Sequence, residues 1–406
     1  MGKRGMTSAF VIIGLLLVFI VAFIITLDPN SLRNEGEEAV LFTQTKESLK
    51  DYVTGCVHFT VLELKEKLWV VDDPELVEDY LKDHYMDCID DFKTFKEKEY
   101  NVNYQTPAYE AEFIGNNLFV YLDFPIELSK AEQKTSFEAF EHRELDYKKV
   151  EIPEGFEMIY RNIIYKEDDY ITEEGFPVHY YVVKIALRDP GTSFLVTPHQ
   201  TGLQPAIDFQ RQQRVQIAIN GDQWPWPPGT VYSSNADVAG LAASLGDLYA
   251  ERPEDSGEVP IFISEDNEVS IGKRPNVVYN AISGSTTLVV KGDVNAKVKD
   301  KGHPDHKDGY ETRRPRTSIG LDEENEHLVL VISVGDTGDM PGLNFRELAY
   351  ILLENQASHA INMDGGGSSS LIIENKGGIV YTAELGGRPV ANHLGIYGTP
   401  YSVTTG

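Results

Sequence analysis

The residues with the clearest capacity for chemistry lie in a short loop, residues 362–370, which reads Asn-Met-Asp-Gly-Gly-Gly-Ser-Ser-Ser. Three consecutive glycines let the backbone adopt positive φ angles and approach a ligand closely. Successive N–H groups in such a turn can bind an anion. Because Asp364 precedes the glycines, the loop could supply both a carboxylate and a binding site for negatively charged oxygens. On its own, the pattern also fits an ordinary Gly/Ser turn between two strands.

A second polar group follows an apolar run that ends at Ile219. It consists of Asn220, Gly221 and Asp222, and it leads into a Pro-rich turn that carries Trp224 and Trp226. Tryptophan faces can stack on sugar rings, and Asn and Asp side chains can hydrogen-bond sugar hydroxyls. A Pro-rich turn with packed aromatic side chains is the alternative.

Arginines form the third and fourth groups. Residues 313, 314 and 316 are all arginine and lead into a predicted strand, and Arg388 and Asn392 precede the last apolar run beside two glycines. A guanidinium group suits a phosphate or carboxylate ligand. A local patch of salt bridges and a simple closing strand are the respective alternatives.

Residues 303–308, His-Pro-Asp-His-Lys-Asp, contain the residue types that bind metal ions. The neighbouring proline, lysine and glycine favour a solvated loop, however. We therefore assign no metal ligands and name no cofactor. A divalent cation is the alternative.

Strands must bring these groups together. Short β-rich runs separated by turn residues occur at 178–187, 193–196, 215–219, 277–279, 287–290, 317–321 and 328–334. One helix is expected at 345–356, where Asn344 is the N-cap and Glu347 completes a capping box. A helix on a mixed β-sheet, α+β in class, is the simplest architecture for residues 151–406.

A smaller α+β module is expected at residues 30–150. Apolar spacing predicts helices at 39–57 and 74–95, a hairpin is expected at 108–127, and charged, low-complexity sequence follows from 129 to 149. Cys56 and Cys88 lie in the two helices, and outside the cytoplasm such a pair is more often bridged than free. Two buried thiols are the alternative to this disulfide.

The first 29 residues predict a transmembrane anchor. Residues 9–27 carry no charge and follow Lys3 and Arg4, and as a helix they would span about 28 Å. No cleavage site follows, so we expect an uncleaved signal-anchor with the rest of the chain outside the cytoplasm. The chain has 64 acidic and 36 basic side chains, a formal charge of −28, which argues against nucleic acid as a partner.

The order and spacing of the four groups resemble the phosphodiester glycosidase family, which includes bacterial members linked to exopolysaccharide. The matching motifs are I-N-G-D at 219–222, P-R-T-x-I-G at 315–320, E-L-A at 347–349, A-x-N-M-D-G-G-G-S-S at 360–369 and R-P-V-A-N-x-L-G at 388–395. The resemblance covers roughly residues 155–400 and leaves the N-terminal third unexplained.

This resemblance implies an extracytoplasmic hydrolase that cleaves a sugar-1-phosphodiester in a glycoconjugate or exopolysaccharide. Such a site needs charge stabilisation on the leaving phosphate and a carboxylate at the oxocarbenium-like centre. Asp364 would be the nucleophile or general base, and Asp222 or Asp336 would be the second carboxylate. The residues that would bind the phosphate and the sugar are Asn220, Gly221, Arg316, Thr317, Gly365, Gly366, Gly367, Ser368, Arg388 and Asn392.

The chain also departs from the family pattern. Members often carry Asp-Gly at the end of the strand before the helix, where this chain has Val334-Gly335, with Asp336 one position later. A catalytically inactive protein that binds phosphoglycans is therefore the main alternative. A serine hydrolase using residues 368–370 is a second alternative, although the G-x-S-x-G context is missing. A purely structural surface protein is a third.

Overall fold

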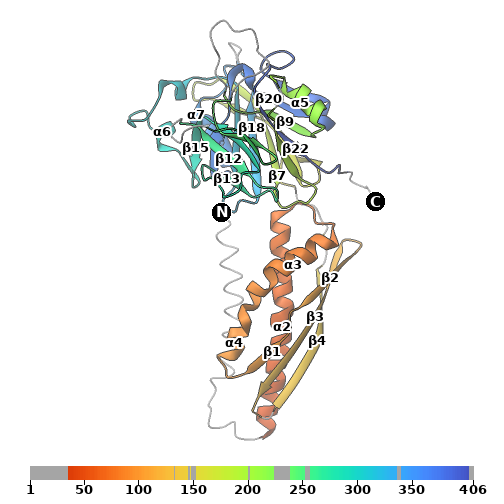
Figure 1. Ribbon diagram of the computed structural model, residues 1–406. Coiled ribbons are helices and arrows are strands. Elements are labelled where there is room, and N and C mark those ends of the chain that lie inside the picture. The colour runs from red at the N-terminus through yellow and green to blue at the C-terminus, as the bar shows by residue number, and fades with distance from the viewer. Residues whose placement is uncertain are drawn as a thin grey trace. The chain divides into compact units, whose positions relative to one another are not determined.

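The computed structural model describes residues 35–131, 133–144, 147, 152–199, 202–223, 238–251, 257–335 and 340–401. The expected anchor at 9–27 lies outside these residues. Among the helices that are described, none is long and apolar enough to cross a membrane. The chain divides into two compact units: Met1–Leu64 with Asp72–Lys148 form unit 1, and Lys65–Val71 with Lys149–Gly406 form unit 2 (Figure 1).

Unit 1 consists of helices packed on a four-stranded antiparallel sheet. Its elements are α2 (Glu35–Lys67), α3 (Pro74–Ile89), η1 (Asp90–Phe92), α4 (Lys93–Lys96), β1 (Asn101–Tyr104), β2 (Ala108–Ile114), β3 (Asn117–Lys130) and β4 (Gln133–Glu144). Strand β3 buries every second residue, so one face of the sheet is apolar, as the two-residue period of a strand requires. On one edge of β3, β1 and β2 pair with successive segments, while β4 pairs along the other edge.

Two expectations for unit 1 have clear outcomes. The disulfide between Cys56 and Cys88 is confirmed, with a Cα–Cα distance of 5.6 Å between α2 and α3. For the charged segment at 129–149 no strand was predicted, but most of it forms β4. Its inward residues, such as the buried Phe140, are separated by exposed charged ones, and the high charge concealed this alternation.

Unit 2 contains three sheets. The eight-stranded sheet has the order β16-β15-β19-β17-β18-β7-β6-β5, and its strands in chain order are β5 (Glu157–Tyr160), β6 (Ile163–Ile171), β7 (Pro177–Ala186), β15 (Thr286–Val290), β16 (Asp293–Val294), β17 (Arg316–Leu321), β18 (His327–Ser333) and β19 (His359–Asn362). A five-stranded sheet, in the order β21-β20-β9-β22-β8, consists of β8 (Ser193–Val196), β9 (Ile217–Asn220), β20 (Ser370–Ile373), β21 (Gly378–Thr382) and β22 (His393–Tyr397). A second five-stranded sheet, in the order β11-β10-β14-β12-β13, consists of β10 (Ala242–Ser244), β11 (Asp247–Ala250), β12 (Val259–Ile263), β13 (Val269–Ile271) and β14 (Asn280–Gly284).

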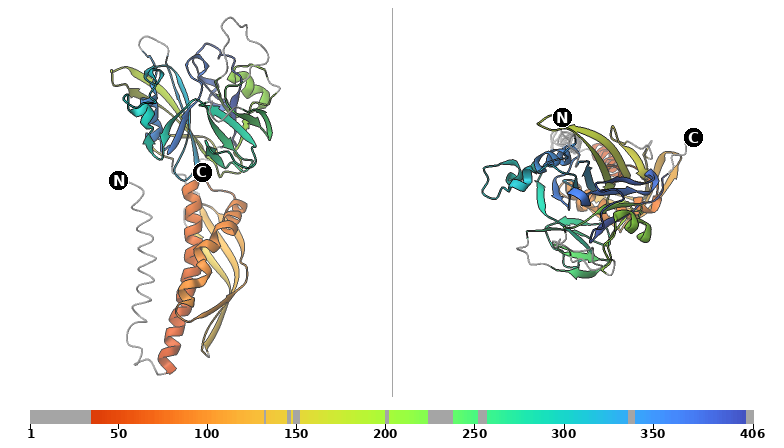
Figure 2. Two further views of the ribbon diagram at one scale, coloured as in Figure 1. Left: turned by 60° about the vertical axis from the view of Figure 1, so that its left-hand side comes forward. Right: turned by 90° about the horizontal axis from the view of Figure 1, so that it is seen from above.

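The facing sheets of unit 2 share one apolar core. This core contains Ile219 of β9, Ile319 of β17, Ile282 of β14 and Leu394 of β22. Helix α7 (Phe345–Glu354) packs on the outer face of the eight-stranded sheet, and α5 (Ala206–Gln213) packs on the outer face of the sheet that contains β9. Figures 1 and 2 show these two helices on opposite outer sides of the unit. Short helices α6 (Ala296–Lys299), η3 (Asp308–Glu311) and η5 (Glu374–Lys376) lie in connections.

The α+β class is confirmed, but details of the sheets differ from expectation. Every strand pair in the described part of unit 2 is antiparallel, so the sheets are not mixed. The helix with its capping box at Asn344 and Glu347 is confirmed, and α5 was not expected. Residues 277–279 do not form a strand, and Val277 is 78% exposed.

The loop at 362–370 crosses between two sheets. It leaves β19 of the eight-stranded sheet and enters β20 of the neighbouring five-stranded sheet, with the short turn η4 (Gly366–Ser368) in between. The pairing registers place the end of β19 near the start of β17, and the end of β9 beside the starts of β20 and β22. All four chemical groups of the sequence therefore meet at one end of the two sheets.

Candidate functional site

Asn220 connects the parts of the site. The residue is fully buried at the end of β9. Its Nδ2 donates to the carbonyl oxygen of Asp364 at 2.7 Å, and its Oδ1 accepts from Thr317 Oγ1 at 2.7 Å and from the Ser370 amide at 3.0 Å. One side chain thus joins both sheets to the loop. These contacts make Asn220 a residue that positions Asp364, whereas we had expected it to orient a sugar.

Asp364 is a partly buried carboxylate at the start of the loop. Its Oδ1 accepts from the Gly365 amide at 2.9 Å. Burial raises the pKa of Asp364, while the Ser368 hydroxyl, the Gly365 amide and the charge of Arg388 act in the opposite direction. A carboxyl group with a raised pKa suits proton transfer, because it changes charge closer to neutral pH.

The glycines permit close packing at two positions. Gly366 has a φ of 61°, in the left-handed region that side chains disfavour. At Gly367, a Cβ atom would lie 2.1 Å from an Nη2 atom of Arg388, so only glycine leaves room for this guanidinium group. Arg388 also pairs with Glu384, through Nε and Oε1 at 2.9 Å.

The sequence suggested that the loop presents an open row of amides to an anion. The structure does not show such a row. The Gly365 amide binds Asp364 Oδ1, the Gly366 amide donates to the Pro315 carbonyl at 2.9 Å, and the Ser368 amide faces the Gly365 carbonyl at 3.4 Å. Three of the four amides of residues 365–368 are thus engaged within the protein. Arginine side chains are left as the main source of positive charge.

Arg316 is a buried cation at the start of β17, only 4% exposed. Its Nε donates to the Leu343 carbonyl at 3.1 Å, one Nη donates to the Thr312 carbonyl at 2.5 Å, and the group lies 4.2 Å from the ring centroid of Phe345. Burial lowers its pKa to about 9. In the described part of the chain, no carboxylate forms an ion pair with it. Its Nη1 lies 3.8 Å from where a Cβ of Gly365 would be, so the loop borders an uncompensated positive charge.

Asp222 is a fully buried carboxyl group beside this loop. Its Oδ1 accepts from the Ser283 amide at 2.6 Å, and its amide donates to Asn392 Oδ1 at 2.7 Å. Its Oδ2 has no hydrogen-bond partner among the described residues. Burial raises the pKa of Asp222 well above its usual value, and the charges of Glu258 and Asp364 raise it further.

Tyr249 and Glu258 were not expected from the sequence. Burial and the charge of Asp222 raise the pKa of Tyr249, and the Asn392 side chain lies close enough to both groups to lower their pKa values. Within the described residues, neither the Tyr249 hydroxyl nor Asn392 Nδ2 makes a hydrogen bond of good geometry. A group of buried polar atoms with unused hydrogen-bonding capacity therefore surrounds Asp222. No local spacing could have revealed it, because Tyr249 lies in β11, in a different sheet from β9, and Glu258 directly precedes β12 of that other sheet.

The remaining predicted residues have varied positions. Asp336, Trp224 and Trp226 lie outside the described residues. Arg313 pairs with Glu347 and Glu174 and so serves as a structural cation. No histidine in the described chain hydrogen-bonds to the serines at 368–370, and residues 303–308 form local contacts such as Asp305 N to His303 Nδ1 at 3.1 Å.

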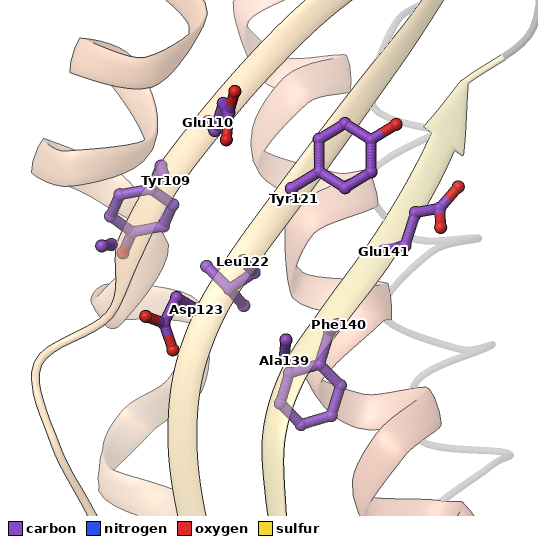
Figure 3. A pocket seen from close by; sticks show the side chains of 9 residues that line it. Tyr109, Glu110, Tyr121, Leu122, Asp123, Ala139, Phe140 and Glu141 are labelled. Carbon is purple, nitrogen blue, oxygen red and sulfur yellow. The ribbon is translucent and has the colours of Figure 1, made fainter.

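A separate hollow lies on the sheet of unit 1 (Figure 3). It is lined by residues of β2, β3 and β4, including Glu110, Tyr121, Asp123 and Glu141. None of the predicted site residues lines it. Its acidic and aromatic lining contains no group that we connect with the chemistry of unit 2.

The site of unit 2 combines two interacting carboxyl groups with buried positive charge, a composition suited to hydrolysis of a bond between a sugar and a phosphate. Residues 213–397 match the model of the phosphodiester glycosidase family. This match confirms the resemblance that the motifs indicated.

Solved structures similar to this chain include two with low sequence identity. The catalytic domain of zebrafish N-acetylglucosamine-1-phosphodiester alpha-N-acetylglucosaminidase has 20% identity over 59% of this chain and 84% of that chain, with a TM-score of 0.46. A hypothetical protein from Synechocystis has 14% identity over 74% of this chain and 78% of that chain, with a TM-score of 0.42. A comparison with curated protein sequences found no match.

Proposed function

We propose that unit 2 hydrolyses a sugar-1-phosphodiester by breaking the bond between the anomeric carbon and the phosphate oxygen. The family match over residues 213–397 supports this class of reaction. The observation that carries the proposal is the coupling of Asp222 and Asp364. The Asp364 amide donates to the carbonyl of Gly221, the neighbour of Asp222, at 3.1 Å. Burial is the main cause of the raised pKa of Asp222, and the charge of Asp364 adds the smallest contribution.

The two carboxyl groups take different roles because their surroundings differ. Asp222 is completely buried, and burial favours its protonated form, which would offer an O–H donor to the substrate. Asp364 is partly exposed and lies near Arg388, so it ionises more readily and acts as nucleophile or general base. A phosphomonoester is a good leaving group, and the reaction therefore depends less on a strong acid than on stabilisation of negative charge.

The two arginines would provide that stabilisation. Arg388 lies directly against Gly367, and the Nη1 end of Arg316 lies beside Gly365. A phosphate seated on the glycine loop would face both guanidinium groups, whose positive charge would stabilise the phosphate oxygens. Asn392 would hydrogen-bond the sugar through its Nδ2 atom.

We further propose that the chain acts outside the cytoplasm on a glycoconjugate or an exopolysaccharide, held to the membrane by residues 9–27. The uncharged sequence of that segment supports the anchor. The Cys56–Cys88 disulfide fits an oxidising compartment.

The position of the broken bond tests the proposed reaction. The purified full chain is incubated with a panel of sugar-1-(methyl phosphate) diesters in water enriched in oxygen-18. Cleavage at the anomeric carbon places the label in the released sugar, whereas a phosphodiesterase would place it in the phosphate. Label in the phosphate would contradict the proposal.

A catalytically inactive binding protein is the second candidate. It is favoured by Val334, which stands where members of the family often have an aspartate and whose amide donates to the His179 carbonyl at 2.9 Å. Titration calorimetry with the same diesters separates the two functions. Heat of binding without any released sugar would select the binding protein.

A further inference from the structure

Three side chains with metal-binding atoms converge in unit 1, in the part of the chain that the family match does not cover. His58 lies on α2, and His142 and Glu144 lie two residues apart on β4. The register pairs His142 with Val120 and Glu144 with Leu118, and both of these residues are fully buried. His142 and Glu144 therefore point from the apolar face of the sheet toward the helix.

The ligand atoms are close enough to share one ion. Glu144 Oε2 lies 2.7 Å from His58 Nδ1 and 3.4 Å from His142 Nε2, and all three ligand atoms lie within 4.8 Å of one another. In a tetrahedral zinc site with bonds of about 2.05 Å, neighbouring ligand atoms are about 3.4 Å apart. The Glu144–His142 distance already has this value. The 2.7 Å hydrogen bond between Glu144 and His58 would have to lengthen to make room for the ion.

The exposure of the side chains leaves one side of the cluster open. His58 is 38% exposed, while Glu144 and His142 are 19% and 17% exposed. Three ligands with an accessible fourth position are typical of zinc sites that bind water or an exchangeable ligand. The nearby Arg143 side chain points away from the cluster. It lies over the ring of Phe119, 5.2 Å from its centroid, and Phe119 faces the opposite side of the sheet from Val120.

We propose that His58, His142 and Glu144 form a binding site for a divalent transition metal ion, with Zn²⁺ as the preferred occupant. Two imidazoles and one carboxylate form a nitrogen- and oxygen-containing ligand set that suits Zn²⁺ better than Ca²⁺ or Mg²⁺. The bound ion links helix α2 to strand β4. This site is independent of the reaction proposed for unit 2.

Binding of Co²⁺ tests the site directly, because Co²⁺ takes the place of Zn²⁺ and absorbs visible light. The full chain, purified in detergent and freed of metal with a chelator, is titrated with CoCl₂ and then with ZnCl₂. We expect one Co²⁺ per chain, with the intense absorption of a four- or five-coordinate ion that Zn²⁺ abolishes. Separate His58→Gln, His142→Gln and Glu144→Gln variants should each bind at least about tenfold more weakly.

His84→Gln is the matched control, because His84 lies in α3 of the same unit and stacks on Tyr80. It should bind Co²⁺ like the wild type. Circular dichroism in the presence of chelator verifies folding, and His58 is exposed enough to be replaced without loss of the core. Absence of stoichiometric binding, or unchanged binding in folded His58→Gln, would show that Glu144 merely hydrogen-bonds two histidines.

Discussion

Replacement of Gly367 by alanine isolates the contribution of Arg388. The new Cβ would lie 2.1 Å from Nη2 and 2.4 Å from Cζ of Arg388, and 2.5 Å from Glu384 Oε1. These atoms are the ends of flexible side chains at the surface, so they can move away. Gly367 does not have a positive φ, and alanine is therefore compatible with its backbone.

The expected consequences differ for activity and for stability. Displacement of the guanidinium group removes a charge-assisted hydrogen bond to phosphate worth about 1.5–3 kcal/mol. On sugar-phosphodiester hydrolysis, this loss lowers kcat/KM by about 10- to 150-fold. The melting temperature should stay constant or rise slightly, because Gly→Ala at a compatible position restricts the unfolded chain.

Gly366→Ala is the matched control with the opposite pattern. Nothing lies within 4 Å of a Cβ at Gly366, but its φ of 61° is costly for alanine. The variant should lose about 1 kcal/mol of stability, measured by urea unfolding, and retain its affinity for substrate. Unchanged kcat/KM in Gly367→Ala, or an equal loss in both variants, would refute the role assigned to Arg388.

Three further predictions concern the supports of the site and of unit 1. Asn220→Ala removes the hydrogen bonds to Asp364, Thr317 and Ser370. It should lower the free energy of unfolding in urea by about 3 kcal/mol and abolish hydrolysis. A loss below about 1 kcal/mol would contradict the connecting role of Asn220. Because burial raises the pKa of Asp222, this residue binds more protons in the folded than in the unfolded chain above about pH 4, and its contribution to stability falls as pH rises toward its pKa in the folded state. Asp222→Asn lacks this penalty, so calorimetric scans should show its stability relative to the wild type growing with pH, and a pH-independent difference would contradict the raised pKa. Reduction of Cys56–Cys88, which are 32 residues apart, should destabilise unit 1 by about 3–4 kcal/mol in chemical unfolding, and no change on reduction would show that the bridge is not formed.

The sequence predicted local features well where they depend on neighbouring residues. The capping box at Asn344 and the hairpin joining β2 to β3 follow from short spacings, and the disulfide was predicted from the expected compartment. The high charge of β4 hid its alternating pattern, and α5 is short and largely polar, with little apolar periodicity to reveal it.

The site was only partly accessible to sequence reasoning. The motifs identified the strand ends that meet around residues 362–370, because each motif follows or precedes an apolar run. The hydrogen bonds that engage Asn220 and the glycine amides depend on tertiary contacts with Thr317, Ser370 and Pro315. Tyr249 lies in a third sheet and Glu258 directly precedes a strand of that sheet, and only the folded chain brings them near Asp222.

Asp364 is the centre of the account, and its replacement tests that account most directly. The measurement is kcat/KM for the best sugar-1-phosphodiester of the panel, compared between the wild type, Asp364→Asn and the exposed control Asp293→Asn, with melting curves to verify folding. The account predicts a loss of at least about 1000-fold in Asp364→Asn and none in the control. A folded Asp364→Asn enzyme with the activity of the wild type would contradict it.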